Sequence, residues 1–171
     1  ALPPWDLRRV LPTAFLETQS KLRGLNEMQG SPVVAVNLFF DQPMMTERFV
    51  GLTNAQTHWF FNKGNHVNAI ASAAENLMDK TRAEITNIVL NDFKKVVHSV
   101  HHVHPVHASV HKIQNATLSS RPGVNDKRPP QKILDNFYVV GDWTKTNLPA
   151  TIESAIKSAF LMQEDLNQTI C

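Results

Sequence analysis

The sequence of 171 residues is poor in the features that define several classes of protein. Its single cysteine, Cys171, is the last residue, so no disulfide can form within the chain. No apolar run approaches the ~18–20 residues of a membrane-spanning helix, and the first residues lack the basic-then-apolar order of a signal peptide. Lysine and arginine are scattered and give a net charge of only +2. We therefore expect a cytoplasmic protein that binds no nucleic acid.

The composition is that of a folded globular protein. Hydrophobic residues make up 42% of the chain and charged residues 19%. A chain of this length can form one domain with a substantial core. We expect an α+β fold.

Local patterns predict the main elements. Pro3 and Pro4 predict the end of a strand, after which Pro12 separates short helical pieces. Residues 31–40 predict a strand, residues 57–63 and 67–73 a hairpin around Gly64, and residues 106–113 another strand. Thr81 and Glu84 have capping-box spacing at the start of a helix over 82–97. The resulting architecture is an antiparallel or mixed sheet with flanking helices.

The last part of the chain combines a strand, a turn and a helix. Residues 137–140 are wholly apolar, which is typical of a strand buried on both faces of a parallel sheet. Gly141 would let a ligand approach closely, and Asp142 would place a carboxylate at the carboxyl end of the strand. Pro149 is expected in the first turn of the helix, whose apolar stripe is Ile152, Ala155, Ile156, Ala159 and Phe160. A purely structural turn would also fit this pattern, because Asp and Pro favour such positions.

The whole string GDWTKTNLPATIESAIKSA, residues 141–159, resembles the C-terminal flavin-binding segment of the squalene-associated FAD-dependent desaturases. This branch of the flavin amine oxidase and phytoene desaturase superfamily includes hydroxysqualene dehydroxylase. The strings ALPPWDLRRVLP, SPVVAVNLFFDQPM and NATLSSRPGVNDKRP resemble further segments of the family in the same order. The resemblance therefore covers nearly all of the chain.

The resemblance implies a set of residues that contact FAD. Asp142 would bond the ribityl or pyrophosphate region, and the backbone of residues 148–151 would approach the isoalloxazine ring. The implied cofactor-binding residues are Gly141, Asp142, Trp143, Leu148, Pro149, Ala150 and Thr151, although Trp143 suits packing equally well. The resemblance also implies a division of the chain into four parts. Residues 1–12 would be the end of a flavin-domain strand and its turn, and residues 13–118 a substrate-binding domain. Residues 119–135 would be a linker, and residues 136–171 a flavin-binding strand-turn-helix.

The sequence also departs from the family pattern. Its six glycines form no G-x-G-x-x-G fingerprint, the motif that holds the pyrophosphate in Rossmann-type domains. We therefore interpret the chain as the C-terminal portion of a flavoprotein whose N-terminal flavin-binding half is missing. Alone it should hold FAD weakly or not at all. The strand over 137–140 would then pair with the missing half or with a second copy in a homodimer.

The resemblance further implies hydride transfer between the flavin and a squalene-like or carotenoid-like isoprenoid, with peripheral membrane contact as a route to the substrate. Phe39, Trp59 and Phe61 are candidates to line the substrate pocket, although aromatic residues on strands usually pack in a core. No catalytic residue stands out, which suits a reaction carried by the flavin ring.

A histidine-rich tract runs from His98 to His111. Imidazoles bind zinc, copper or nickel, and His104, His107 and His111 are the candidates for a metal site, but no Cys, Asp or Glu spacing supports one. We therefore assign no metal. The alternative to a flavoenzyme portion is a non-catalytic α+β module that has lost FAD and binds a metal or a partner through this tract.

Overall fold

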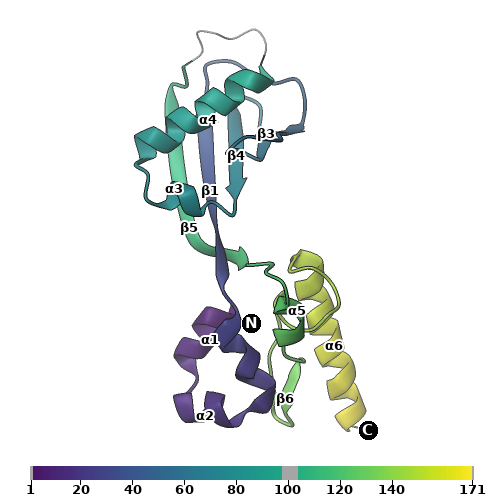
Figure 1. Ribbon diagram of the computed structural model, residues 1–171. Coiled ribbons are helices and arrows are strands. Elements are labelled where there is room, and N and C mark those ends of the chain that lie inside the picture. The colour runs from purple at the N-terminus through teal and green to yellow at the C-terminus, as the bar shows by residue number, and fades with distance from the viewer. Residues whose placement is uncertain (1, 98–103, 171) are drawn as a thin grey trace. The chain divides into compact units, whose positions relative to one another are not determined.

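The computed structural model describes residues 2–97 and 104–170, and the chain forms two compact units (Figure 1). The insert unit is Ser31–Ala116. The terminal unit combines the chain up to Gly30 with the chain from Thr117 onward. Residues 13–30 thus belong with the C-terminal segment, whereas the sequence-based division places them in the substrate domain.

A five-stranded sheet forms the insert unit, with the strand order β2-β3-β4-β1-β5. The strands are β1 (Gly30–Phe39), β2 (Phe49–Gly51), β3 (Trp59–Asn62), β4 (His66–Ser72) and β5 (His107–Leu118). Strands β3 and β4 pair antiparallel, and Gly64 between them has a φ of 85°, a value that glycine adopts readily. The predicted strand and hairpin are confirmed, and only the three-residue β2 was not expected.

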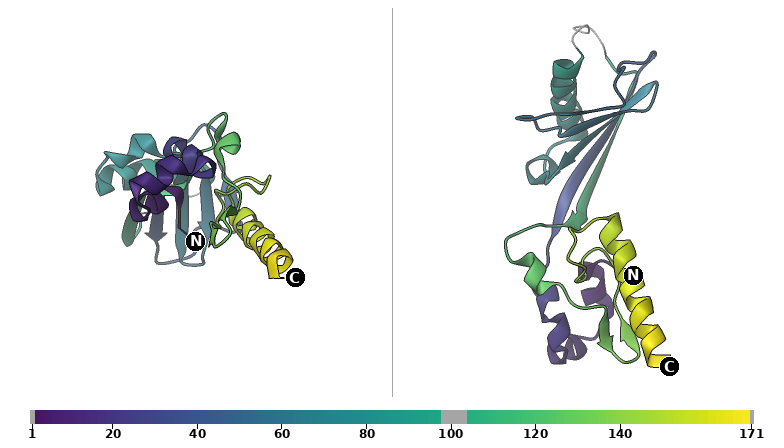
Figure 2. Two further views of the ribbon diagram at one scale, coloured as in Figure 1. Left: turned by 90° about the horizontal axis from the view of Figure 1, so that it is seen from below. Right: turned by 90° about the vertical axis from the view of Figure 1, so that its right-hand side faces the viewer.

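The long helix α4 (Arg82–Val96) covers one face of this sheet (Figures 1 and 2). Its capping box is formed as predicted, with the Thr81 and Glu84 side chains each accepting a hydrogen bond from the other's backbone N–H. The short helix α3 (Glu75–Met78) precedes it. The core between helix and sheet includes the fully buried side chains of Val36, Leu38, Phe60, Val67 and Ile85.

The terminal unit begins with three short helical segments. They are α1 (Pro4–Val10), α2 (Thr13–Thr18) and the 3₁₀ helix η1 (Ser20–Glu27). The break at Pro12 is confirmed, but Pro3 and Pro4 start a helix instead of ending a strand, because proline suits a first helical turn, where its missing N–H leaves no bond unmade. Their apolar residues share a core with the C-terminal segment; its buried members include Leu7, Leu22, Leu25, Met28, Ile133, Val139 and Trp143.

The expected doubly buried strand is wrong. Strand β7 spans only Phe137–Tyr138 and pairs antiparallel with β6 (Lys132–Leu134) in a two-stranded sheet. Both residues of β7 are half-buried, whereas Val139 beyond it is buried. A run of apolar residues shows that a segment is buried, but it does not specify the neighbouring strand. The segment 119–135 also contains a short helix, α5 (Val124–Lys127).

The last helix, α6 (Ile152–Ile170), packs against the terminal unit through its small polar residues. Ser154 and Ser158 are fully buried, whereas Ile152, Ile156 and Phe160 are 81%, 53% and 59% exposed. The predicted apolar stripe is therefore present but lies on the open side of the helix. Among the helices of residues 2–97 and 104–170, none is long and apolar enough to cross a membrane.

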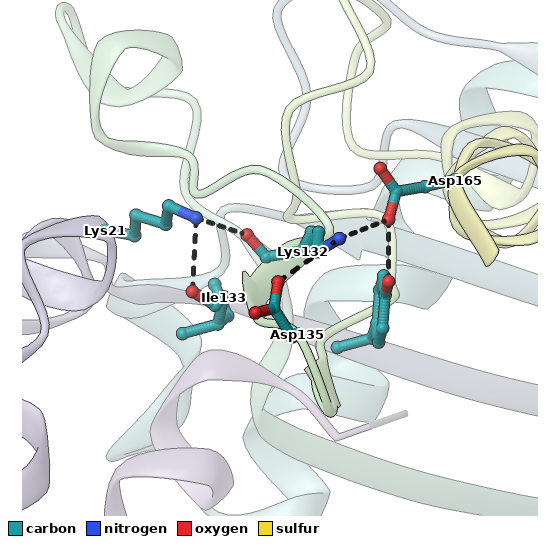
Figure 3. A network of polar contacts seen from close by, with 6 residues as sticks. Lys21, Lys132, Ile133, Asp135 and Asp165 are labelled. Carbon is teal, nitrogen blue, oxygen red and sulfur yellow. Dashed lines mark hydrogen bonds and ion pairs between the residues drawn. The ribbon is translucent and has the colours of Figure 1, made fainter. Parts of the chain in front are cut away.

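A polar network ties α6 to the two-stranded sheet (Figure 3). Asp165 on α6 accepts a hydrogen bond from the Tyr138 hydroxyl at 2.6 Å and forms an ion pair with Lys132 at 3.3 Å. The Lys21 ammonium donates to the backbone carbonyls of Lys132 and Ile133, which joins η1 to the same sheet. These contacts hold the strand-turn-helix segment in place.

Candidate functional site

The turn after β7 is fixed to α6 by the two buried serines. The Gly141 N–H donates to Ser158 Oγ at 2.9 Å, and Ser154 Oγ donates to the Asp142 carbonyl at 3.0 Å. Ser154 Oγ also lies 2.6 Å from Thr146 Oγ1. The small hydroxyl side chains let the helix approach the turn closely while its polar groups remain bonded.

The packing of the Trp143 side chain requires a glycine at position 141. A Cβ built on Gly141 would lie 2.6 Å from Nε1 of Trp143, closer than packed atoms tolerate. Trp143 is 2% exposed, and its indole N–H donates to the Leu2 carbonyl at 2.8 Å. The glycine therefore makes room for a packed indole, and the packing role is the one that the structure gives Trp143.

Arg128 holds both ends of the loop that follows Asp142. It is 6% exposed, and its guanidinium donates to the Leu148 carbonyl at 2.5 Å and to the Asp142 carbonyl. These acceptors stand 14 and 20 residues away from Arg128 in the sequence. One planar, rigid donor group thus bridges the two carbonyls.

The buried charge of Arg128 is only partly compensated. Burial lowers the pKa of its guanidinium, and the negative charge of Asp142 opposes this effect. Its Nε atom is buried and has no hydrogen-bond partner among the described residues. An unpaired buried donor costs free energy, so packing stability does not by itself account for an arginine here.

A cavity of about 500 Å³ lies beside this loop, within the terminal unit. Its walls include the cationic residues Arg121, Arg128 and Lys145, together with Asp126. Its remaining lining residues are Leu118, Ser120, Val124, Asn125, Asn147, Leu148, Pro149 and Ala150. The lining carries more positive than negative side chains, which favours a ligand with anionic or electron-rich groups.

Three of the residues that the sequence assigned to a cofactor line this cavity, namely Leu148, Pro149 and Ala150. Gly141, Asp142 and Thr151 are not among its lining residues. Pro149 precedes the first turn of α6, contrary to expectation, because the helix begins at Ile152. Thr151 occupies the N-cap position: its carbonyl accepts from the Ala155 N–H at 3.0 Å and its hydroxyl oxygen accepts from the Ser154 N–H at 3.5 Å. The positive end of α6 therefore lies immediately after the cavity-lining residues.

The insert unit carries the three aromatic candidates on one face of its sheet. Phe39 is stacked on His66 with ring centroids 5.1 Å apart. Trp59 and Phe61 lie on β3 with their rings 6.2 Å apart, and Phe49 of β2 contacts both. The fully buried Phe60 between them points to the opposite face, against Phe93 of α4. Strand alternation thus places Trp59 and Phe61 outside the helix-covered core.

A polar row crosses the same face. Asn68 Nδ2 donates to Asn37 Oδ1 at 2.8 Å, and Asn37 Nδ2 donates to Ser109 Oγ at 3.3 Å. Asn37 and Asn68 are register partners on β1 and β4, and Asn68 is also paired with Phe61 of β3. The row therefore runs next to the aromatic group.

The histidines that were candidates for a metal site do not form one in the described part of the chain. His104 and His107 are exposed, and the His107 ring packs 5.6 Å from Phe39. No group of three or more His, Cys, Asp or Glu side chains with metal-binding geometry occurs in the part of the chain that the structure describes. His98, His101 and His102 of the same tract lie outside the described residues.

The fold of the chain is similar to that of a solved protein structure. A crystal structure from Exiguobacterium sp. 255-15, named as a protoporphyrinogen oxidase, matches 98% of this chain with a TM-score of 0.67 and 12% sequence identity. The match covers 40% of that chain. At this identity the likeness defines the fold alone.

The sequence comparisons identify the family. The flavin containing amine oxidoreductase family matches residues 1–162, so the chain belongs to that family. Hydroxysqualene dehydroxylases from Zymomonas mobilis subsp. mobilis and Sinorhizobium fredii are 25% and 27% identical to it over 159 residues. These matches cover 92% of this chain but only 36% and 35% of the two relatives, so the chain spans about a third of their length.

The sequence patterns did not identify Arg128, Ser154 or Ser158. The serines carried a signal, since they recur at i and i+4 on the face of α6 opposite its apolar stripe. Arg128 carried none, because a single arginine in a proline-rich loop is ordinary on a protein surface. Its position became apparent only from contacts distant in sequence.

Proposed function

We propose that the terminal unit forms one part of an FAD-binding site. The observation that carries this proposal is the loop from Asp142 to Leu148, which is fixed at both ends and leads into a cavity-lining segment and a helix N-terminus. The chemistry of the lining suits the group: backbone and cationic side chains can accommodate electron-rich ring oxygens and phosphates. Leu148, Pro149 and Ala150 would contact the flavin ring, and Asp142 would accept hydrogen bonds from ribityl hydroxyls.

The open face of α6 would dock the polypeptide that holds the rest of the cofactor. Ile152, Ile156 and Phe160 are exposed and follow one another at i, i+4 and i+8. The relatives contain nearly twice as much sequence outside the matched region as within it, and this chain has no pyrophosphate-binding glycine motif. We propose a segment carrying G-x-G-x-x-G as the occupant of this face.

The activity that we propose is that of an FAD-dependent oxidoreductase acting on squalene-like or carotenoid-like isoprenoids. When bound, the flavin would exchange a hydride with a substrate carbon. The insert unit would bind the isoprenoid chain through Phe39, Trp59, Phe61 and Phe49. Aromatic and aliphatic groups associate by excluding water, which suits a substrate that is almost entirely hydrocarbon.

The polar row would give this surface a means of orienting its substrate. A hydroxyl on an otherwise apolar chain would exchange hydrogen bonds with Asn68 and Asn37. A site built to bond a hydroxyl discriminates strongly against an analogue without one, because its own polar groups are then unpaired. The row therefore favours a hydroxylated isoprenoid.

The flavin proposal is tested on the protein expressed from its complete reading frame. It should purify with flavin absorbance or take up added FAD, whereas residues 1–171 alone should retain much less. A colourless complete protein that takes up no FAD would contradict the proposal. Retention of FAD by the isolated chain as a dimer would show instead that a second copy supplies the missing contacts.

The substrate surface is tested with Trp59→Ala in the complete protein. Loss of this partly exposed ring should raise the KM for an isoprenoid substrate by about tenfold, as expected when 1–2 kcal/mol of apolar contact is removed. Ile113→Ala is the matched control, since Ile113 is also partly exposed on the insert unit. Equal KM values for both variants would remove the aromatic group from the substrate site.

A further inference from the structure

We infer that Arg128 is a positioning residue that presets the loop Asp142–Leu148 for the flavin, an inference that rests on the proposed function. The residues that the sequence resemblance implies for the cofactor all lie within the motif itself, between Gly141 and Thr151. Arg128 lies outside it, yet its guanidinium bonds the carbonyls of the first and last residues of the loop.

Other contacts hold the middle of the loop, where Gln131 Nε2 donates to Thr144 Oγ1 at 3.1 Å and Thr146 Oγ1 lies 2.6 Å from Ser154 Oγ. At its far end, the Leu148 carbonyl accepts from Arg128.

Asn147 adopts a left-handed backbone conformation, with φ at 60°, directly before Leu148. Such a conformation persists when its surroundings enforce it. The hydrogen bond from Arg128 to the Leu148 carbonyl acts on the next residue, so it is well placed to hold this bend.

The opposite end of the loop is held by two donors at once. The Asp142 carbonyl accepts from both the Arg128 guanidinium and Ser154 Oγ. The serine joins this end to α6 and also contacts Thr146 within the loop, whereas the arginine bonds the carbonyls of both loop ends directly. Arg128 therefore links the Asp142 end of the loop directly to Leu148, which lines the cavity.

Lysine could not replace this function fully. A guanidinium presents several N–H groups in one plane and can bond two carbonyls in a fixed arrangement, whereas an ammonium is a point charge on a flexible stem. Arg128→Lys should therefore keep the charge but lose part of the geometry. Arg128→Met removes both and retains the side-chain length.

The first experiment needs no cofactor and uses residues 1–171. Amide hydrogen exchange of residues 142–151 should accelerate at least tenfold in Arg128→Met and less in Arg128→Lys, with the insert unit unchanged. Arg121→Met is the matched control, because Arg121 lines the same cavity but is exposed. Unchanged loop exchange in Arg128→Met would overturn the inference.

The second experiment measures FAD dissociation constants and flavin absorbance spectra in the complete protein. Arg128→Met should bind FAD at least tenfold more weakly with a shifted spectrum, and Arg128→Lys should recover part of both. Ile133→Ala provides a core variant for comparison; it should lower the melting temperature but leave the spectrum unchanged.

The possible failures are distinguishable. A wild-type protein that binds no FAD would contradict the proposed function while the loop-exchange result still measured the role of Arg128. If the flavin spectrum and the FAD affinity of all variants change only in proportion to their melting temperatures, Arg128 acts on stability alone. That result would overturn the inference.

Discussion

The longest helix of the insert unit, α4, and that of the terminal unit, α6, bury their apolar residues with very different completeness. In the insert unit, strand residues that point toward α4 are almost fully buried, and Val36, Leu38, Phe60 and Val67 have no exposed surface. In the terminal unit, the longest helix buries serines and exposes Ile152, Ile156 and Phe160. The first pattern is that of a completed core, and the second is that of an exposed apolar surface.

The difference shows that an apolar stripe along a helix does not by itself place that stripe in a hydrophobic core. Both units contain an amphipathic helix, but only α4 has its apolar side against a sheet within the described structure. The apolar side of α6 has no equivalent cover in the described part of its unit. The attachment of α6 therefore depends more on polar anchors such as Ser154 and Ser158 than the attachment of α4 does.

Phe60→Ala should produce the largest loss of stability, and it tests how tightly the core of the insert unit is packed. Truncating a fully buried phenylalanine costs about 3–5 kcal/mol through lost contacts and the cavity left behind. Hydrogen exchange of β3 and β4 amides during chemical denaturation would measure it. Phe49→Ala, which removes a ring that is 56% exposed, should cost far less; similar losses would show that the core is loosely packed.

Ser158→Ala should have the next largest effect on stability, and it tests whether a polar contact attaches α6 to the terminal unit. It removes the acceptor of the Gly141 N–H, and leaving that group unpaired costs about 1–3 kcal/mol. Exchange of the amides in α6 would report the loss. The control is Gln163→Ala on an exposed position of the same helix; equal effects of the two changes would exclude the buried serine as an anchor.

Acid should destabilise the insert unit through Asp92. Burial would raise the pKa of this carboxyl, but the ammonium of Lys95 and the N–H of Thr57 donate to it and lower the pKa below its ordinary value of 3.8. Its contribution is therefore full above the pKa of the unfolded chain and is lost as the pH falls through the lower folded value. Urea unfolding at several pH values should show a decline in acid that is reduced in Asp92→Asn; identical pH profiles would contradict this account.

Ile156→Ser should have the smallest effect on the stability of residues 1–171. Substitutions at exposed positions usually change stability by less than about 0.5 kcal/mol. In the complete protein the same change should weaken stability or FAD retention, because the open face of α6 would then be covered. A large loss in the isolated chain would show that this face is already packed, for example in a dimer, and melting curves at several protein concentrations would reveal it.

Local patterns predicted the elements well and long-range contacts poorly. The capping box at Thr81 and Glu84 and the hairpin at Gly64 depend on residues close in sequence, and both were confirmed. The antiparallel pairing of β7 was missed because an apolar run does not specify its neighbour. Arg128 was missed because its acceptors are distant in sequence, and burial of an arginine depends entirely on such contacts.

The path of the chain through the two units has one further consequence. The insert unit is a single continuous stretch, and the terminal unit consists of the two segments on either side of it. Within the terminal unit, the Ser119 N–H donates to the Gln29 carbonyl at 2.8 Å, so the points where the chain departs and returns are neighbours. A stretch whose ends meet in this way can be lengthened, exchanged or removed without moving the segments around it. This connectivity would let a lineage change the insert unit while retaining the loop that follows Asp142.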